Sequence, residues 1–273
     1  MATFEHQDLT GSTFTDVSVR GATFNRVDLH SARMRSVSIR GAVLRGVELR
    51  QVTIYGEGVD LVVNGVDVGP LVEAELDRRD PDRAAMRPTD ADGFRQAWVI
   101  VERRWATIVE RARGLRPEQL HESVDGEWSF VQTLRHLLYA TDVWVARAML
   151  GDPRPWHPLD LPFDEMDPHP EVPWDRDVRP DLDAVLALRT ERMALVRQVL
   201  AGLSDERLAG TTDPVEGPSW PPAEAYPVRE VLLTVLNEEW MHRVYAERDL
   251  DALAATSPSS GDDPPRLEHR TAH

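Results

Sequence analysis

The sequence predicts a two-part protein of the α+β class, a short β-solenoid followed by an antiparallel four-helix bundle. In residues 2–56, large apolar side chains recur every five positions, a spacing that fits neither an α-helix nor a strand. Later in the chain, four long segments carry apolar residues at helical spacing. We therefore expect a solenoid in 1–56, a hairpin cap and linker in 57–90, a helical domain in 91–252 and a disordered polar tail in 253–273.

The five-residue repeat runs without interruption over eleven positions. Its large residues are Phe4, Leu9, Phe14, Val19, Phe24, Leu29, Met34, Ile39, Leu44, Leu49 and Ile54. A small or medium side chain stands two places before most of them, so each face of a four-sided coil is expected to turn one large and one small residue inward. On these residues the segment resembles the pentapeptide-repeat family, which implies a right-handed quadrilateral β-helix. Phe14 and Phe24 are then expected in its interior.

The segment after the repeats is suited to cover the open end of so short a solenoid. Asn64-Gly65 stands between two β-branched runs, which is the strongest local signal for a tight β-hairpin. Residues 73–90 then become charged and contain proline, so we expect a connector with one helical turn.

Four amphipathic helices are expected in the remainder of the chain, at 93–115, 129–150, 181–203 and 228–250. Asp92 is expected to cap the first helix, and Gly151-Asp152-Pro153 to end the second. Helices of this length joined by proline-rich crossings predict an up-down bundle. The crossing at residues 152–180 is either a lid over the mouth of the bundle or simply a long connection.

Composition excludes several kinds of chemistry. The chain has no cysteine, and all 31 of its basic residues are Arg, so disulfides, thiolate metal sites and Cys or Lys nucleophiles are excluded. The net charge of −16 disfavours nucleic acid and anionic membranes as partners. Residues 1–55 hold seven Arg and five acids, a charge of +2, so the remainder carries −18. The N-terminus has no signal-peptide pattern and no apolar run reaches membrane length, so a cytoplasmic location is expected.

The candidate functional residues are histidines within the predicted helices. Among the nine His, only His136 and His242 fall inside long helical segments. Glu238 precedes His242 by four residues, so both side chains share one helix face. An inward carboxylate is costly unless a counter-charge neutralises it, and a metal ion would do so. In the competing interpretation, both histidines are core residues bonded to carbonyls or to Glu238; Glu239 also competes as the carboxylate ligand.

Three segments resemble the DinB-like family of four-helix metalloproteins. They are Glu127-Trp128-Ser129, Thr133-Leu134-Arg135-His136-Leu137 and Asn237-Glu238-Glu239-Trp240-Met241-His242-Arg243. The resemblance implies a metal site with one His on the second helix and a His-x3-His pair on the last helix. This chain has Glu238-x3-His242 instead of the pair. The metal ligands expected are therefore His136, Glu238 and His242, with zinc favoured over iron or nickel.

The same resemblance implies a thiol-dependent transferase or isomerase, in which the metal lowers the pKa of a low-molecular-weight thiol such as mycothiol. A small-molecule substrate and a thiol are then the expected partners, since the chain has no cysteine of its own. No catalytic residue and no organic cofactor is assigned. The alternative is a scaffold protein that uses the solenoid for docking or for homodimer formation.

Overall fold

The chain forms two compact units, Met1–Glu57 and Gly58–His273. The computed structural model describes residues 3–15, 17–35, 37–56, 60–164, 166–217 and 220–256. The two units are considered separately.

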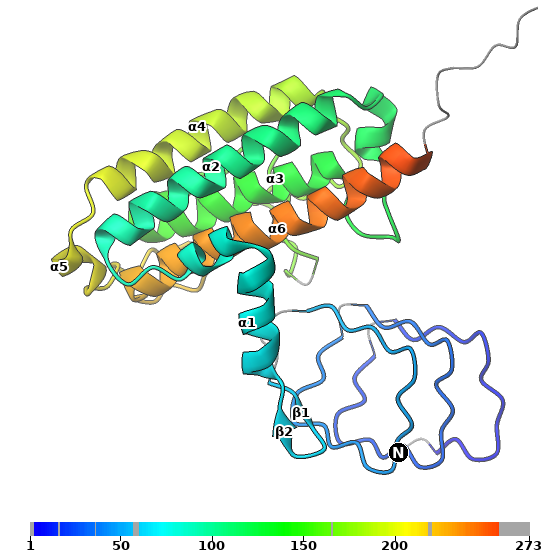
Figure 1. The fold of residues 1–273 in the computed structure, drawn as a ribbon. Helices are drawn as coiled ribbons and strands as arrows, with labels where there is room; N and C mark the ends of the chain where they lie inside the picture. Colours follow the sequence, from blue (N-terminus) through cyan, green and yellow to red (C-terminus); the bar gives the residue numbers. More distant parts are fainter. Residues whose placement is uncertain are drawn as a thin grey trace, which may run out of the picture. The chain divides into compact units, whose positions relative to one another are not determined.

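The first unit is a coil that turns every five residues (Figure 1). Between residues 6 and 51, every described residue two places after a large repeat residue has a positive φ. These residues are His6, Gly11, Gly21, Arg26, Ser31, Gly41, Gly46 and Gln51, with φ from 54° to 76°. A left-handed residue costs about 1–2 kcal/mol unless it is glycine, and half of these positions are glycine. The five-residue period is therefore a period of backbone turns as well as of apolar side chains.

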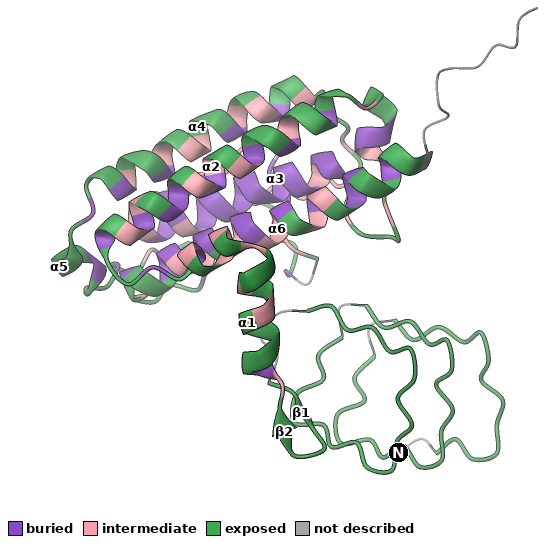
Figure 2. Cartoon of the chain, in the orientation of Figure 1, coloured by how far each residue is buried: buried purple, intermediate pink, exposed green. Residues whose placement is uncertain are grey.

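The interior packing predicted for this unit is wrong for the structure. The eleven large residues are 41–66% exposed, and Phe14 and Phe24 are among them (Figure 2). Backbone hydrogen bonds join residues three apart, as from the Ser12 N–H to the Leu9 carbonyl, and residues 3–56 contain no strand where they are described. Without ladder bonds holding successive coils at the roughly 4.8 Å spacing of paired strands, the apolar side chains remain uncovered.

The second unit opens with the predicted hairpin. Strand β1 (Val62–Val63) pairs antiparallel with β2 (Val66–Asp67). Asn64 and Gly65 have φ of 50° and 84°, as a two-residue turn of this type requires. The hairpin is therefore confirmed.

The linker is more helical than the predicted single turn. Helix α1 (Gly69–Arg79) spans 11 residues and is followed by the 3₁₀ helix η1 (Pro81–Met86). Pro70 lies in the first turn, where its missing N–H is not needed. Glu75 pairs with Arg78 and Arg79, three and four residues further on, and such pairs support a helix. The charged composition that indicated a connector therefore forms a helix face.

Four long helices form the body of the second unit: α2 (Ala91–Arg113), α3 (Phe130–Thr141), α4 (Leu182–Ala201) and α6 (Val228–Thr256). Helices α2 and α3 each pack against both α4 and α6, so the four surround one core (Figure 1). Helices α2, α4 and α6 bury their inner faces and expose their outer faces, whereas α3 is buried on nearly all sides (Figure 2). The shorter elements are η2 (Pro117–His121) and α5 (Asp205–Leu208).

The helices differ from prediction in three places. Asp90, not Asp92, caps α2, because its carboxylate accepts from the Gly93 N–H at 2.7 Å. The second predicted helix continues from α3 into a π-helix, η3 (Asp142–Met149). Helix α6 extends to Thr256, six residues past its predicted end, and the rest of the predicted disordered tail lies outside the described residues. No helix in the described part of the chain is long and apolar enough to span a bilayer.

A buried ion pair crosses the core between α4 and α6. Arg189 donates to both oxygens of Glu239, at 2.8 and 2.7 Å, and both side chains are at most 4% exposed. The guanidinium also lies over the Trp105 ring of α2, 5.6 Å from its centroid. Removing one partner of such a pair leaves a buried charge with no counter-charge, which is far more costly than losing a surface pair.

We expect Arg189→Met to lower the free energy of unfolding by about 3–5 kcal/mol, because it strands the Glu239 carboxylate in the core. The matched control is Arg197→Met on the same helix, which removes a largely exposed pair with Glu102 and should cost about 0–1 kcal/mol. Urea denaturation followed by circular dichroism measures both. Equal losses in the two variants would contradict the structural role of the buried pair.

Candidate metal site

Helices α3 and α6 bring the three predicted ligands together. His136 lies in the middle of α3, and Glu238 and His242 lie one turn apart on the facing side of α6. One ligand atom from each side chain lies within 4.8 Å of the other two. His136 is buried, while Glu238 and His242 are partly buried, so the cluster is mostly enclosed but accessible to solvent.

Backbone carbonyls fix the orientation of both imidazole rings. His136 Nδ1 lies 3.0 Å from the Leu161 carbonyl, and His242 Nδ1 lies 2.8 Å from the Glu238 carbonyl. A carbonyl oxygen can only accept, so each Nδ1 carries the proton in these bonds. Each Nε2 is then the nitrogen available to bind a cation. Metal-ligating histidines are typically held in this way by their second nitrogen.

The remaining nitrogen of His136 faces a carboxylate. His136 Nε2 and Glu238 Oε2 are 3.3 Å apart, and two lone pairs at this distance repel each other unless a cation lies between them. That cation is either a proton on Nε2 or a metal ion. A charge-assisted N–H···O bond is normally about 2.7–2.9 Å long, whereas two ligands about 2.1 Å from a tetrahedral zinc ion stand about 3.4 Å apart. The observed separation is closer to the second value.

An aromatic wall borders the cluster. The Trp128 ring lies 4.6 Å from the His136 ring and 6.1 Å from the His242 ring, between centroids. The indole N–H of Trp128 donates to Asp164 at 3.2 Å, which anchors the ring. Trp128 therefore shields one side of the histidine pair from water.

The choice between the two adjacent glutamates is decided by helix geometry. Glu239 points into the core and is occupied by Arg189, as described above. Glu238 lies 100° around the helix, where its Oε2 is 3.3 Å from His136 Nε2 and 3.4 Å from His242 Nδ1. Glu238 is therefore the acidic residue of the cluster.

The environment shifts the pKa values of two cluster residues in the direction that favours metal binding. Burial raises the pKa of Glu238, but the hydrogen bond and charge of His136 outweigh this and the pKa is lowered overall. Burial, together with the charge of His136, lowers the pKa of His242 from 6.5 to about 4. At neutral pH, His242 is therefore neutral and Glu238 is ionised, which are the states required of ligands.

The crossing between η3 and α4 is packed against the helices. Arg135 is fully buried and donates to the carbonyls of Leu159 and Asp175, at 2.8 and 2.5 Å. Leu161 is fully buried and supplies the carbonyl that orients His136. Of the two interpretations of this segment, the structure favours a fixed crossing. The functional part of Leu161 is its backbone, so no side-chain pattern in the sequence could have identified it.

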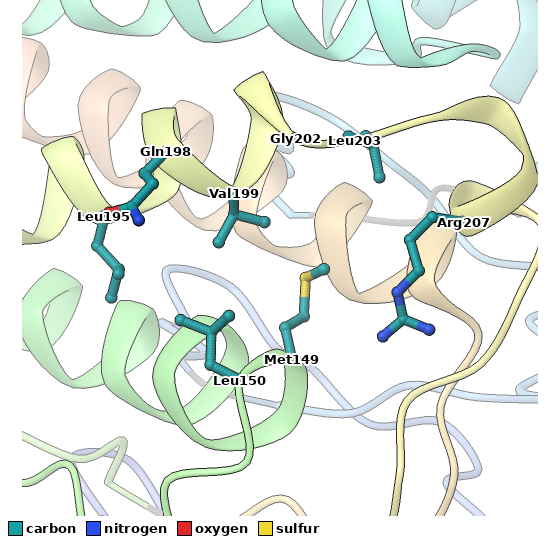
Figure 3. A pocket seen from close by; sticks show the side chains of 8 residues that line it. All are labelled: Met149, Leu150, Leu195, Gln198, Val199, Gly202, Leu203 and Arg207. Atoms are coloured by element: carbon teal, nitrogen blue, oxygen red, sulfur yellow. The ribbon is translucent and has the colours of Figure 1, made fainter.

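Other histidines of the second unit lie outside the cluster. His157 and His169 each accept, through Nδ1, the backbone N–H two residues on, at 3.1 and 3.2 Å. A surface hollow of about 280 Å³ lies between the end of η3 and the C-terminal part of α4 (Figure 3). Met149 and Leu150 face Leu195 and Val199 across it, and no cluster residue lines it.

Comparison with known families supports both predicted resemblances. A family model described as the DinB superfamily matches residues 100–246, more than half of the 273 residues, and this range contains all three cluster residues. A model of pentapeptide repeats matches residues 12–51 in eight copies. No curated protein and no solved structure shows significant similarity to the chain.

The low pKa of His242 predicts a pH dependence of stability in protein kept metal-free with a chelator. Between pH 6.5 and about 4 the unfolded chain binds a proton at this residue and the native chain does not, so the free energy of unfolding falls as pH falls. The contribution over this window is about 3 kcal/mol. His242→Gln should flatten the curve by this amount in urea titrations at several pH values. Parallel curves for the parent and the variant would contradict the assignment.

Proposed function

Because the chain belongs to the DinB superfamily, we propose that its second unit is a metal-dependent enzyme built on an antiparallel four-helix bundle. His136, Glu238 and His242 would hold one divalent ion. The main support is the distance of 3.3 Å between His136 Nε2 and Glu238 Oε2. His136 Nδ1 cannot serve instead, because it donates to the Leu161 carbonyl. A divalent ion between His136 Nε2 and Glu238 Oε2 is the cation that we propose.

The donor set fits a borderline divalent ion. Two imidazoles and one carboxylate suit zinc, and they also suit iron or nickel. Three protein ligands do not complete a tetrahedral shell, and an open position is characteristic of catalytic rather than structural zinc. The chain contains no cysteine that could serve as a fourth ligand.

The reaction we propose is transfer or isomerisation that uses a low-molecular-weight thiol, with mycothiol, bacillithiol and glutathione as candidates. The bound ion would supply a lowered thiol pKa, so that thiolate is available at neutral pH. The protein's own residues would orient and enclose the reactants. Trp128 covers one side of the histidines, and the carbonyls of Leu161 and Glu238 hold the two rings in a fixed orientation.

One observation favours a second candidate function, a scaffold that associates through its pentapeptide repeats. The eleven large apolar residues of the first unit are 41–66% exposed, and exposed apolar rows of this size mark association surfaces. A scaffold without an enzymatic role has no need of a stoichiometric ion. Metal content therefore separates the two candidates, and sedimentation of the full chain tests whether it forms a homodimer.

Purified protein should contain close to one zinc, iron or nickel ion per chain by elemental analysis. His242→Ala should remove the ion and leave the helical circular dichroism largely intact, because a partly exposed side chain at the site contributes little to the core. The matched control is His121→Ala, which changes a histidine outside the cluster and should retain the metal. Parent protein that carries no metal and takes up none when it is added would refute the proposed enzyme.

Cobalt-substituted protein tests the role of thiol. Added thiol should produce a thiolate-to-cobalt charge-transfer band, with the apparent pKa of the thiol shifted towards neutral pH. Glu238→Gln should weaken this effect, because it replaces an anionic ligand by a neutral one. Absorbance is recorded as a function of pH for each of the three thiols. If none of them gives a band although cobalt is bound, the thiol reaction is excluded and the metal site remains.

A further inference from the structure

A second buried polar cluster lies behind the candidate metal site. Asp142, the first residue of η3, and Asp160, in the crossing, are both almost fully enclosed. Arg192 of α4 donates to both oxygens of Asp142, each at 3.0 Å. Asp160 Oδ2 accepts from the backbone N–H of His157 at 3.0 Å. Asp160 Oδ1 is buried and has no hydrogen-bond donor among the described residues.

Two carboxyl groups share one directly bonded guanidinium in this cluster, that of Arg192. Arg192 pairs with Asp142, and an ionised Asp160 would keep a buried oxygen without a donor, which is unfavourable. None of the other described groups facing the pair donates a hydrogen bond to Asp160 Oδ1. His157 is neutral at pH 7, because burial and the charge of Arg192 lower its pKa. Arg135 acts on Asp160 electrostatically, but its guanidinium is bonded to backbone carbonyls.

A proton on Asp160 resolves both the charge and the unpaired oxygen. The two carboxyl groups lie within hydrogen-bonding reach of each other, so an O–H on Asp160 Oδ1 can donate to Asp142. Asp142 has lone pairs to spare after accepting from Arg192. Burial and the negative charge of Asp142 raise the pKa of Asp160 well above its ordinary value, consistent with a neutral acid.

This acid pair is connected to the metal site through one residue. Leu161, next to Asp160, donates its N–H to the Arg135 carbonyl at 3.3 Å and accepts from His136 Nδ1 at 3.0 Å. A hydrogen bond from Asp160 to Asp142 would tie this point of the crossing to η3 and, through Arg192, to α4. Such a tie would help to hold the Leu161 carbonyl, and with it the His136 ring, in place.

We propose that Asp160 is a neutral carboxylic acid that donates a hydrogen bond to Asp142, and that this pair is a positioning device for the His136 ring. The positioning role rests on the proposed function, because orienting the His136 ring matters only if that ring binds a metal ion. Both the proton and the ring position are properties of the metal-free protein, so they can be tested independently of that site.

The test compares Asp160→Asn with Asp160→Ala. The asparagine amide keeps the shape and can donate to Asp142, whereas alanine cannot. In ¹⁵N-histidine-labelled, metal-free protein, the His136 Nδ1–H resonance, assigned by its loss in His136→Gln, should persist in Asp160→Asn and disappear in Asp160→Ala.

Cobalt affinity should follow the same order, unchanged in the first variant and about tenfold to hundredfold weaker in the second, as for other residues that orient metal ligands. The infrared spectrum at neutral pH should contain a carboxylic-acid band that Asp160→Asn lacks.

Three results would overturn the proposal: no acid band that depends on Asp160, loss of the ring proton in Asp160→Asn, or its retention in Asp160→Ala. If Asp160→Ala does not fold, the infrared band and the asparagine variant still decide. Parent protein that binds no cobalt would refute the metal site and leave the ring-proton and infrared results to decide the positioning role.

Discussion

Every ionised side chain that points into the helical unit must meet an opposite charge or a set of aligned dipoles, and this requirement organises the core. Arg189 and Glu239 satisfy each other across α4 and α6, and Arg192 satisfies Asp142 across α4 and η3. Such pairs add little net stability compared with apolar packing, but they tolerate few other arrangements of the helices. They therefore fix the orientation of α4 and α6 relative to their neighbours.

The same requirement holds the irregular crossings in place. Arg135 and Arg147 are buried on α3 and η3, bond no carboxylate among the described residues, and donate to backbone carbonyls instead. Arg147 donates to the carbonyls of Pro153 and Val215. One guanidinium is therefore hydrogen-bonded both to the crossing between η3 and α4 and to the connection between α5 and α6. A loop carbonyl in the core needs a donor as much as the guanidinium needs an acceptor. The crossing held in this way includes Leu161, whose carbonyl orients His136.

Local patterns in the sequence were sufficient for most of the regular elements. Helical periodicity predicted all four long helices, and Asn64-Gly65 predicted the hairpin. The five-residue repeat predicted a regular coil, because a turn recurs with each repeat. The same repeat did not predict burial, because covering an apolar side chain depends on contact with the next coil and not on the residue itself. The linker was predicted less helical than it is, because i, i+4 ion pairs give a helix that has no apolar stripe.

The sequence by itself determined the family, the four long helices and the residue types of the candidate site, since one histidine in α3 and a Glu-x3-His spacing on α6 are local facts about helix faces. Only the tertiary structure decided which glutamate joins the cluster, because a rotation of 100° separates Glu238 from Glu239 and the helix packing selects the face. It also decided the supporting groups, Leu161, Asp160 and Arg192. These lie up to 56 residues from His136 in the chain, and their proximity follows from the way α3, α4 and the crossing pack together.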